Sequence, residues 1–324
     1  MPIDRRSLLA LTAGAVVLPA LARAQTFPTR PVRIIVPYPP GGPTDVLARI
    51  LADDMRTSLG GAVIVENRAG ASGAVGTREA ARSDPDGHTI VLGTNQTHVT
   101  NAFLLKDAGY DPIKDFAPVA GVADLQHVLV TSKMLGAATA GELIARARRE
   151  PGKLNYGSTG AGSGSHLAME LFKVKTGTEM QHVPFRGAAP MVLELIAGRI
   201  DLSFATLPSV LGQIQAGEIK ALALASHVPA PQLPDLPLLK TQGVIDGEAD
   251  AWLALFAPRA TPAAIMARLS QSVVSALAKP DVVQGAIKQG IAVNVRPPQA
   301  FAAYHAGEMT KWAEVVRVAQ VKVD

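Results

Sequence analysis

The stretch VRIIVPYPPGGPTDVLARIL, residues 32–51, contains a strand, a turn and a helix in that order. Valine and isoleucine dominate its first five positions, which is typical of a buried strand, and the Pro-Pro-Gly-Gly run at 39–42 then breaks the chain. Pro43 suits a first helical turn, and Asp45 offsets the helix dipole there. The apolar residues that follow recur with the spacing of an amphipathic helix. We therefore expect a strand over residues 32–38 and a helix from Pro43 to near Gly60 and Gly61.

The same alternation of strand and helix recurs along the chain. Apolar runs predict strands at residues 62–66, 89–93, 153–156, 181–185, 200–205 and 219–226. Helical spacing predicts helices at residues 74–81, 166–172, 190–197 and 209–215, and a mostly helical end from residue 263. Strands that alternate with helices favour parallel-rich sheets with helices on both faces. The predicted fold class is therefore α/β.

Two apolar segments, residues 117–130 and 249–258, are flanked by proline, glycine and aspartate and interrupt this alternation. A domain that is inserted into another is joined to it by two crossings, and two such segments meet that requirement. The sequence therefore predicts one discontinuous lobe at residues 26–120 plus 255–324. A second lobe, inserted into the first, is expected at residues 121–254.

The first 24 residues have the organisation of an export signal. Arg5 and Arg6 precede an apolar run at residues 8–21, and Ala22-Arg23-Ala24 matches an A-x-A cleavage site. The apolar run is too short to span a bilayer as a helix. We expect cleavage of a signal peptide, residues 1–24, after Ala24 and a periplasmic protein, with an uncleaved anchor as the alternative. The paired arginines resemble a twin-arginine signal, and the Sec route is the other way out of the cell.

Composition excludes several classes of function. The chain has no cysteine, so it carries no thiolate nucleophile, disulfide or thiolate metal site. The formal net charge is +4; without Asp4, Arg5, Arg6 and Arg23 of the export signal, 28 basic and 26 acidic residues remain, a charge of +2. So small a net charge does not indicate a basic surface that would bind nucleic acid. We predict neither a cofactor nor a metal.

The sequence signatures of common enzymes are missing. No serine lies in a G-x-S-x-G elbow, and no G-x-x-x-x-G-K-[ST] motif occurs. The run Gly162-Ser163-Gly164 does not complete a G-x-G-x-x-G pattern, because Leu167 stands at its last position. The seven histidines include no H-x-x-x-H pair. A secreted hydrolase that uses Ser163 and His166 is kept as an alternative, although no acid is placed to orient the histidine.

Six loops that follow predicted strands are rich in glycine, serine, threonine and asparagine and carry few charges. They are residues 39–44, 67–73 and 94–97 in the first lobe, and residues 157–165, 186–188 and 206–209 in the second. Open α/β sheets bind ligands at the carboxyl ends of their strands. Helix N-termini at such positions offer free N–H groups with partial positive charge, and glycines let a ligand approach them. The loops therefore favour a site that binds a small carboxylate through backbone N–H groups and hydroxyls, with few charged side chains.

The predicted ligand-binding residues come from these loops and the positions beside them. Arg186 is expected to pair with a carboxylate or, alternatively, to form a surface ion pair. His166 is expected to contact the ligand or to help cap its helix, and Tyr38 to line the mouth of the site or the core. Asp45 would repel an anion, so it is assigned a structural role. The full set is Tyr38, Pro39, Gly41, Gly42, Pro43, Thr44, Asn67, Ala71, Ser72, Thr94, Asn95, Ser158, Thr159, Gly160, Ser163, His166, Arg186, Gly187 and Thr206.

These residues resemble those of a known family, the substrate-binding proteins of tripartite tricarboxylate transporters, called TctC or Bug. The resemblance rests on VPYPPGGPTD (36–45), VENRAGASG (65–73), LNYGSTG (154–160), PFRGAAP (184–190), GRID (198–201) and the segment 252–258, in that order. It implies a two-lobed, type II-like periplasmic-binding-protein fold with the ligand cleft between the lobes. It also implies that one ligand carboxylate is held by the loops at residues 39–45 and 158–163.

The combined prediction is a periplasmic solute-binding protein and not an enzyme. It is expected to capture a small organic carboxylate between two lobes and to deliver it to membrane subunits of the TctA and TctB kind. We expect a monomer with no nucleic-acid partner. A ligand-loaded partner of a membrane signalling receptor is the alternative, because the same site serves both functions.

Overall fold

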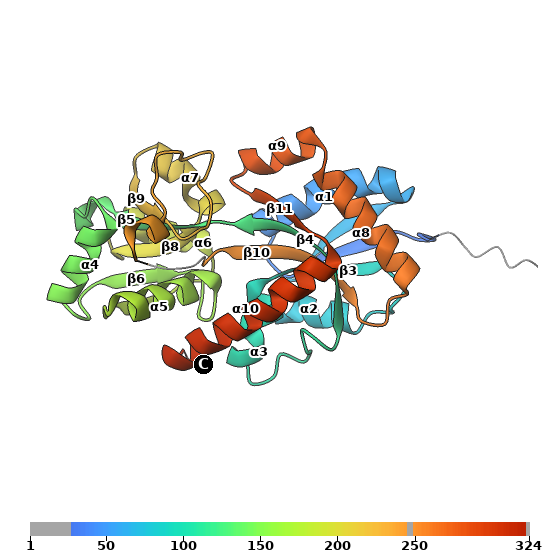
Figure 1. The fold of residues 1–324 in the computed structure, drawn as a ribbon, viewed down its shortest axis with the longest axis horizontal. Helices are drawn as coiled ribbons and strands as arrows, with labels where there is room; N and C mark the ends of the chain where they lie inside the picture. The colour runs from blue at the N-terminus through green and yellow to red at the C-terminus, as the bar shows by residue number, and fades with distance from the viewer. Residues whose placement is uncertain (1–26, 245–248, 322–324) are drawn as a thin grey trace, which may run out of the picture.

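Two β-sheets divide the molecule into two lobes (Figure 1). The structure is a computed structural model and describes residues 27–244 and 249–321. The predicted export signal and its cleavage site lie outside these residues. Within the described residues, no helix combines the length and apolar character needed to cross a membrane.

The first sheet has the strand order β11-β4-β10-β3-β1-β2. Its strands are β1 (Val32–Val36), β2 (Val63–Asn67), β3 (Thr89–Thr94), β4 (Phe116–Leu125), β10 (Ala251–Pro258) and β11 (Ala292–Arg296). The helices of this lobe are α1 (Pro43–Leu59), α2 (Ala74–Ala81), α3 (Asn101–Leu104), α8 (Ala263–Leu277), α9 (Pro280–Lys288) and α10 (Pro298–Val318), with the 3₁₀ turn η1 (Ala71–Gly73) and the π-helical turn η2 (Gln96–Thr100). β1 pairs in parallel with β2 and β3, whereas β10 is antiparallel to β3 and β4.

The second sheet has the strand order β7-β6-β8-β5-β9. Its strands are β5 (His127–Ser132), β6 (Asn155–Ser158), β7 (Gln181–Pro184), β8 (Leu202–Thr206) and β9 (Ile219–Leu224). The helices of this lobe are α4 (Ala140–Arg149), α5 (Gly164–Thr176), α6 (Ala188–Ile196) and α7 (Leu207–Gln215), with the 3₁₀ turns η3 (Lys133–Leu135) and η4 (Leu239–Gln242). β6 pairs in parallel with β7 and β8, and β5 is antiparallel to β8 and β9.

Both sheets contain one strand that arrives from the other lobe. This strand is β10 in the first sheet and β5 in the second, and each runs antiparallel to both of its neighbours. The predicted α/β, two-lobed architecture is therefore confirmed, but the sheets are mixed and not uniformly parallel. A chain that returns from another lobe enters a sheet from the end where the parallel strands finish, so it must run in the opposite direction.

The two segments predicted to cross between the lobes are themselves strands. β4 ends at Leu125 and β5 begins at His127, so Gln126 alone separates the two sheets on the outward crossing. On the return crossing Ala249 N still donates to Ala225 O of the second lobe at 2.9 Å, and β10 of the first sheet begins at Ala251. Continuous apolar runs of this kind are typical of strands buried on both faces. The predicted lobe boundaries, 120/121 and 254/255, fall inside β4 and β10 and remain a proposal.

Two further elements differ from the prediction. The polar segment 94–97, predicted to be a loop, is divided between two elements: Thr94 ends β3, and Gln96 and Thr97 begin η2, whose backbone is π-helical. The helical end of the chain is interrupted by β11, which pairs with β4. The alternation of Val293 and Val295 before two prolines is the local signal that indicates this strand.

Helices cover both faces of the first sheet, as predicted. On one face Ile34 belongs to the same buried cluster as Leu47 of α1 and Leu269 of α8. On the other face Ile35 belongs to a cluster with Ala80 of α2. Successive residues of a strand point to opposite faces, so the two isoleucines separate the two cores.

Glu308 fastens the C-terminal helix α10 to the sheet. Its buried Oε2 accepts hydrogen bonds from Trp252 Nε1 of β10 (3.1 Å) and from Trp312 Nε1 (2.9 Å), and Lys311 pairs with its other oxygen. The far end of α10 reaches the second lobe, where it contacts α5 (Figure 1). This carboxylate therefore anchors a helix that spans both lobes.

Replacing Glu308 with glutamine should lower the free energy of unfolding by about 1–2 kcal/mol. Hydrogen bonds to a charged acceptor contribute more than those to a neutral amide oxygen, and the variant keeps an acceptor for both indoles. Urea denaturation would measure the change. Glu314→Gln, on the exposed face of the same helix, is the matched control and should leave stability nearly unchanged. Equal losses in the two variants would contradict the anchoring role.

Candidate functional site

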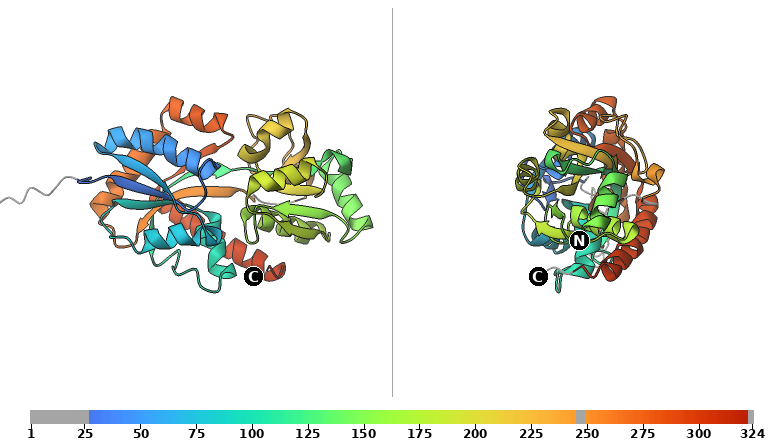
Figure 2. Two further views of the ribbon diagram at one scale, coloured as in Figure 1. Left: turned by 180° about the vertical axis from the view of Figure 1, so that it is seen from behind. Right: turned by 90° about the vertical axis from the view of Figure 1, so that its left-hand side faces the viewer.

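The parallel strands of both sheets end at the edges that the two crossings join. In the first lobe Thr94, the last residue of β3, pairs with Leu253 near the start of β10. In the second lobe Thr206, the last residue of β8, pairs with His127, the first residue of β5. Figure 2 shows the two lobes side by side with the crossing strands between them. The loops after β1, β2 and β3 are therefore directed toward the loops after β6, β7 and β8.

Asp45 organises the loop that precedes α1. Its buried carboxylate accepts hydrogen bonds from Gly41 N (2.9 Å), Asn67 Nδ2 (3.0 Å) and Arg49 Nη2 (2.9 Å). Burial alone would raise the pKa of Asp45, but these donors lower it overall. Asn67 Nδ2 also donates to Tyr38 O at 3.1 Å, so the side chain of Asn67, a predicted ligand contact, is engaged in holding the loop.

This loop places the N-terminal end of α1 at the site, and no side chain caps that end of the helix. Gly42 is the N-cap residue and provides no side-chain cap, and Pro43 follows at the first helical position. Pro39 and Gly41 are exposed, whereas Thr44 is buried in the first turn. Gly41 has φ +85°, a conformation that favours glycine.

Tyr38 and Thr94 meet at the ends of β1 and β3. Tyr38 Oη and Thr94 Oγ1 are 2.7 Å apart, and Tyr38 also donates to Gln96 Oε1 at 3.2 Å. Burial raises the pKa of Tyr38 above its usual range, so the phenol is neutral and acts as a donor. Asn95 is buried beside this pair, and its Nδ2 has no hydrogen-bond partner among the described residues. The predicted residues of these two strand ends therefore lie together.

Ala71 and Ser72 form the turn after β2 in an unusual conformation. Their φ angles are +46° and +55°, in the left-handed region that non-glycine residues avoid. Asn101 Nδ2 donates to Ser72 O at 3.0 Å and holds the turn against η2 and α3. Two consecutive residues of this kind cost of order 1–3 kcal/mol each, which is typical of functional turns.

The hydroxyl groups of the second-lobe loop bond mainly to one another. Ser165 Oγ accepts from Thr159 N (2.9 Å) and lies 2.9 Å from Ser163 Oγ. Ser163 Oγ also caps α5 by accepting from His166 N at 3.3 Å. Ser158 Oγ donates to Gly160 O at 3.0 Å. The predicted donors are thus brought together, but as a network that shapes the loop.

A stack of aromatic side chains packs beside the second-lobe loop at residues 157–165. The rings of His166 and His182 lie 3.8 Å apart and nearly parallel, and Tyr156 stacks on His182 at 4.9 Å. Ser158 Oγ and His182 Nε2 are 2.6 Å apart. Tyr156 donates to buried Glu170. No role was predicted for His182, Tyr156 or Glu170, because they meet only when β6 pairs with β7 and α5 packs against β6.

His166 is a neutral acceptor in this arrangement. Its Nδ1 accepts a hydrogen bond from Gly162 N at 3.0 Å. Burial, and then the charges of His182 and Lys173, lower the pKa of His166 to about 3. Among the described residues Ser163 Oγ bonds to Ser165 Oγ and to the backbone of His166, and not to the imidazole. The serine and histidine of the hydrolase alternative are therefore not joined as nucleophile and base.

Two helices of the second lobe begin at the site without a side-chain cap. Gly187 is the N-cap of α6, and its N–H donates a hydrogen bond to Thr159 O at 3.2 Å. Arg186, the residue before it, is exposed. Thr206 is the N-cap of α7, and its Oγ1 bonds to Ser209 Oγ at 3.1 Å in place of the helix backbone.

The electrostatic character of the site follows from these helix ends. α1 from the first lobe and α6 and α7 from the second all begin at the facing edges without a side-chain cap. Uncapped helix N-termini carry partial positive charge and free N–H donors. At α1 the first-turn carboxylate of Asp45 offsets part of this charge and is itself paired with Arg49, whereas α6 and α7 have no acid in their first turn. Among the described residues, no group of three or more histidine, aspartate or glutamate side chains is arranged to hold a metal ion. The arrangement suits a small anion held by backbone donors.

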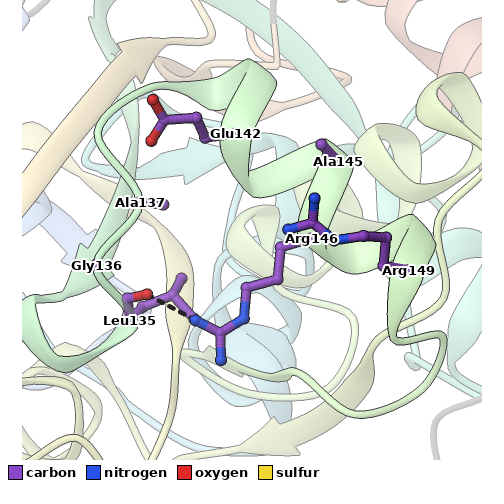
Figure 3. Close-up of a pocket in the computed structure, with 7 residues that line it drawn as sticks. All are labelled: Leu135, Gly136, Ala137, Glu142, Ala145, Arg146 and Arg149. Carbon is purple, nitrogen blue, oxygen red and sulfur yellow. Dashed lines mark hydrogen bonds between the residues drawn. The ribbon is translucent and has the colours of Figure 1, made fainter.

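Two cavities lie away from these loops. One, of about 280 Å³, lies between α4 and η3 in the second lobe; Arg146 lines it and donates from Nη1 to Leu135 O at 2.7 Å (Figure 3). The other, of about 640 Å³, lies between α8 and the start of α10. None of the predicted ligand-binding residues lines either cavity.

Comparison with known proteins identifies one family. A family model described as the tripartite tricarboxylate transporter family receptor matches residues 47–321. The protein BugT of Bordetella pertussis is 35% identical over 313 residues, which cover 96% of this chain and 95% of BugT.

Solved structures agree with this match. The structure of R. palustris Rpa4515 with adipate has a TM-score of 0.84 and 34% sequence identity, and the match covers 91% of this chain and 99% of that one. The periplasmic binding protein BugD has a TM-score of 0.80 and 32% identity, with 91% and 99% covered. The predicted periplasmic-binding-protein fold is therefore confirmed, and the matched family consists of transport receptors and not of enzymes.

Proposed function

This chain belongs to the tripartite tricarboxylate transporter receptor family, and on that premise we propose that it captures a small organic carboxylate between its lobes and delivers it to the membrane subunits of such a transporter. The observation that supports the carboxylate most directly is the set of uncapped helix N-termini, α1 from one lobe and α6 and α7 from the other. Rpa4515, a related structure, holds adipate, which is a dicarboxylate.

The proposed capture depends on donors from both lobes. When two lobes close around an anion they exclude water, and each N–H···O interaction then acts in a medium of lower dielectric constant. Arg186, exposed at the start of α6, is the residue that we assign to pairing with a carboxylate. We propose that the other ligand-binding residues predicted from the sequence line the site.

The cellular setting is part of the same proposal. The family places the protein among periplasmic binding proteins. We propose export by the signal in residues 1–24, with cleavage after Ala24, and docking as a monomer on TctA- and TctB-like subunits. Pull-down with those subunits, against the ectodomain of a sensor kinase, would separate transport from signalling.

A carboxylate panel should raise the melting temperature. A ligand present at 100 times its dissociation constant stabilises the folded state by about 2.7 kcal/mol. For a chain of this size that corresponds to a shift of roughly 5 °C. Differential scanning fluorimetry with adipate, malate, succinate, benzoate and citrate would show it, with amino-acid amides and sugars as controls that carry no carboxylate. A shift with these controls alone would contradict the proposal.

A further inference from the structure

The lobes touch directly at the turn before α5, called here the Gly162 turn (residues 160–164). Thr100, the last residue of η2 in the first lobe, donates from Oγ1 to Gly162 O in the second lobe at 3.2 Å. Thr100 is 1% exposed and Gly162 is buried. This hydrogen bond therefore joins the buried interior of one lobe to the proposed ligand loop of the other.

The Gly162 peptide is held in place by its own lobe. Its N–H donates to His166 Nδ1 at 3.0 Å, and its φ of +74° is a conformation that favours glycine. Ser163 N donates to Gly160 O at 3.1 Å and closes the turn. The carbonyl of Gly162 is thus presented to Thr100 in one orientation.

The lobes pack closely on both sides of the site. A Cβ on Gly164 of the second lobe would lie 3.6 Å from Nδ2 of the buried Asn95 of the first lobe, which is van der Waals contact. At the opposite side, a Cβ on Gly290 of the first lobe would lie 3.2 Å from Pro208 Cα of the second. The structure therefore has the lobes in contact around the proposed ligand loops.

Thr100 has a second acceptor within its own lobe. Its Oγ1 also lies 3.3 Å from Gln96 O, one turn earlier along the chain. A hydroxyl has one proton to donate. When the lobes separate, the Thr100 hydroxyl can donate it to Gln96 O, so the donor is not left without a partner. The interlobe bond therefore breaks at less than the cost of an unsatisfied buried donor, which suits a contact that must open and close.

We propose that Thr100 is a positioning residue that stabilises the closed arrangement of the lobes by donating to Gly162 O. It acts on a bound ligand through the Gly162 turn and not by direct contact. This inference goes beyond the proposed function, because closure of the lobes is measurable with no ligand present.

Pulsed electron–electron double resonance, which measures the distance between two spin labels, would test the proposal with one label in each lobe. The chain has no cysteine, so Asp53→Cys in α1 and Arg149→Cys in α4 would be the only attachment sites. Thr100→Val should raise the ratio of open to closed distances about two- to tenfold, the factor that corresponds to one neutral hydrogen bond. Thr100→Ser, which keeps the hydroxyl, should restore the wild-type ratio.

Thr310 offers a matched control. It lies in α10, and among residues 27–244 and 249–321 its hydroxyl bonds to the carbonyl one turn earlier, Ala306 O at 3.3 Å, and not to the other lobe. Thr310→Val should leave the distance distribution unchanged. An unchanged ratio in Thr100→Val, an equal rise in Thr310→Val, or a failure of Thr100→Ser to restore closure would each overturn the proposal.

Binding kinetics separate this inference from the proposed function. With adipate as the probe, Thr100→Val should raise the dissociation rate constant by the same factor and leave the association rate constant unchanged. If no carboxylate of the panel binds, the proposed function fails, whereas the distance measurement still decides the role of Thr100.

Discussion

Replacing Ala188 with aspartate should weaken carboxylate binding about 100-fold. Ala188 is the first residue of α6, and its N-cap, Gly187, provides no side-chain cap. The new carboxylate would occupy the helix N-terminus that we assign to the ligand. Two unit charges about 6 Å apart repel by about 3 kcal/mol at an effective dielectric constant of about 20, which corresponds to roughly 100-fold in affinity. Isothermal titration calorimetry with adipate would measure the loss.

Ala263 provides a matched control for this charge. It is the first residue of α8, which also begins without a side-chain cap, and it is exposed beside the groove between α8 and α10. An acid in the first turn should stabilise either helix by about 0.3–1 kcal/mol. Ala263→Asp should therefore keep full affinity. Equal affinities in the two variants would remove α6 from the binding site.

The protein should lose stability steeply as the pH falls below about 6.5. Five histidines have lowered pKa values, chiefly because of burial: His98, His127, His166, His182 and His305. The pKa of His127 is about 4, and that of His166 is about 3. In the unfolded chain a histidine titrates near 6.5, so below that pH the unfolded state binds more protons than the folded state.

The size of this loss follows from the same linkage. Each such histidine removes about 1.4 kcal/mol of stability per pH unit, from about 6.5 down to its folded pKa. His127 and His166 together then remove about 3 kcal/mol per pH unit down to about pH 4, and a typical domain has about 5–15 kcal/mol in total. Melting temperatures from circular dichroism should change little between pH 8 and about pH 6.5 and should fall continuously from about pH 6.5 to pH 4. A constant melting temperature from pH 7 to pH 4.5 would contradict this expectation.

A single substitution isolates one histidine of this set. His127 Nδ1 lies 2.6 Å from Ala249 O, and its backbone N–H donates to Asp250. Asparagine in its place keeps an N–H donor for Ala249 O but does not titrate. His127→Asn should therefore reduce the slope of stability against pH by about 1.4 kcal/mol per pH unit between about 6.5 and 4. An unchanged slope would assign the acid sensitivity to other groups.

Much of the secondary structure was predictable because its signals are local. The helix expected from Pro43 to near Gly60 is α1, which ends at Leu59 with Gly60 in the left-handed conformation. The helix expected at residues 74–81 coincides with α2. Each prediction depended on residues that lie a few positions apart, where proline, glycine and apolar spacing act directly on the backbone.

The candidate site was only partly predictable for the same reason. Tyr38 and Thr94 were both expected in it, and they do meet. Asn67 was expected to contact a ligand, yet its amide bonds to Asp45 and Tyr38. Thr100 was not considered at all, because its partner Gly162 is 62 residues away and in the other lobe.

The sequence by itself determined the alternation of strands and helices, the two crossings and the polar loops at the strand ends, since these depend on preferences among neighbouring residues. The tertiary structure alone decided which polar groups of those loops are engaged and which helix ends are free. Ser158 and His182 become partners only after β6 pairs with β7, and Thr100 reaches Gly162 only when the two lobes meet. A hydrogen bond forms over about 3 Å of space whatever the separation along the chain, so its partners are set by the folded arrangement.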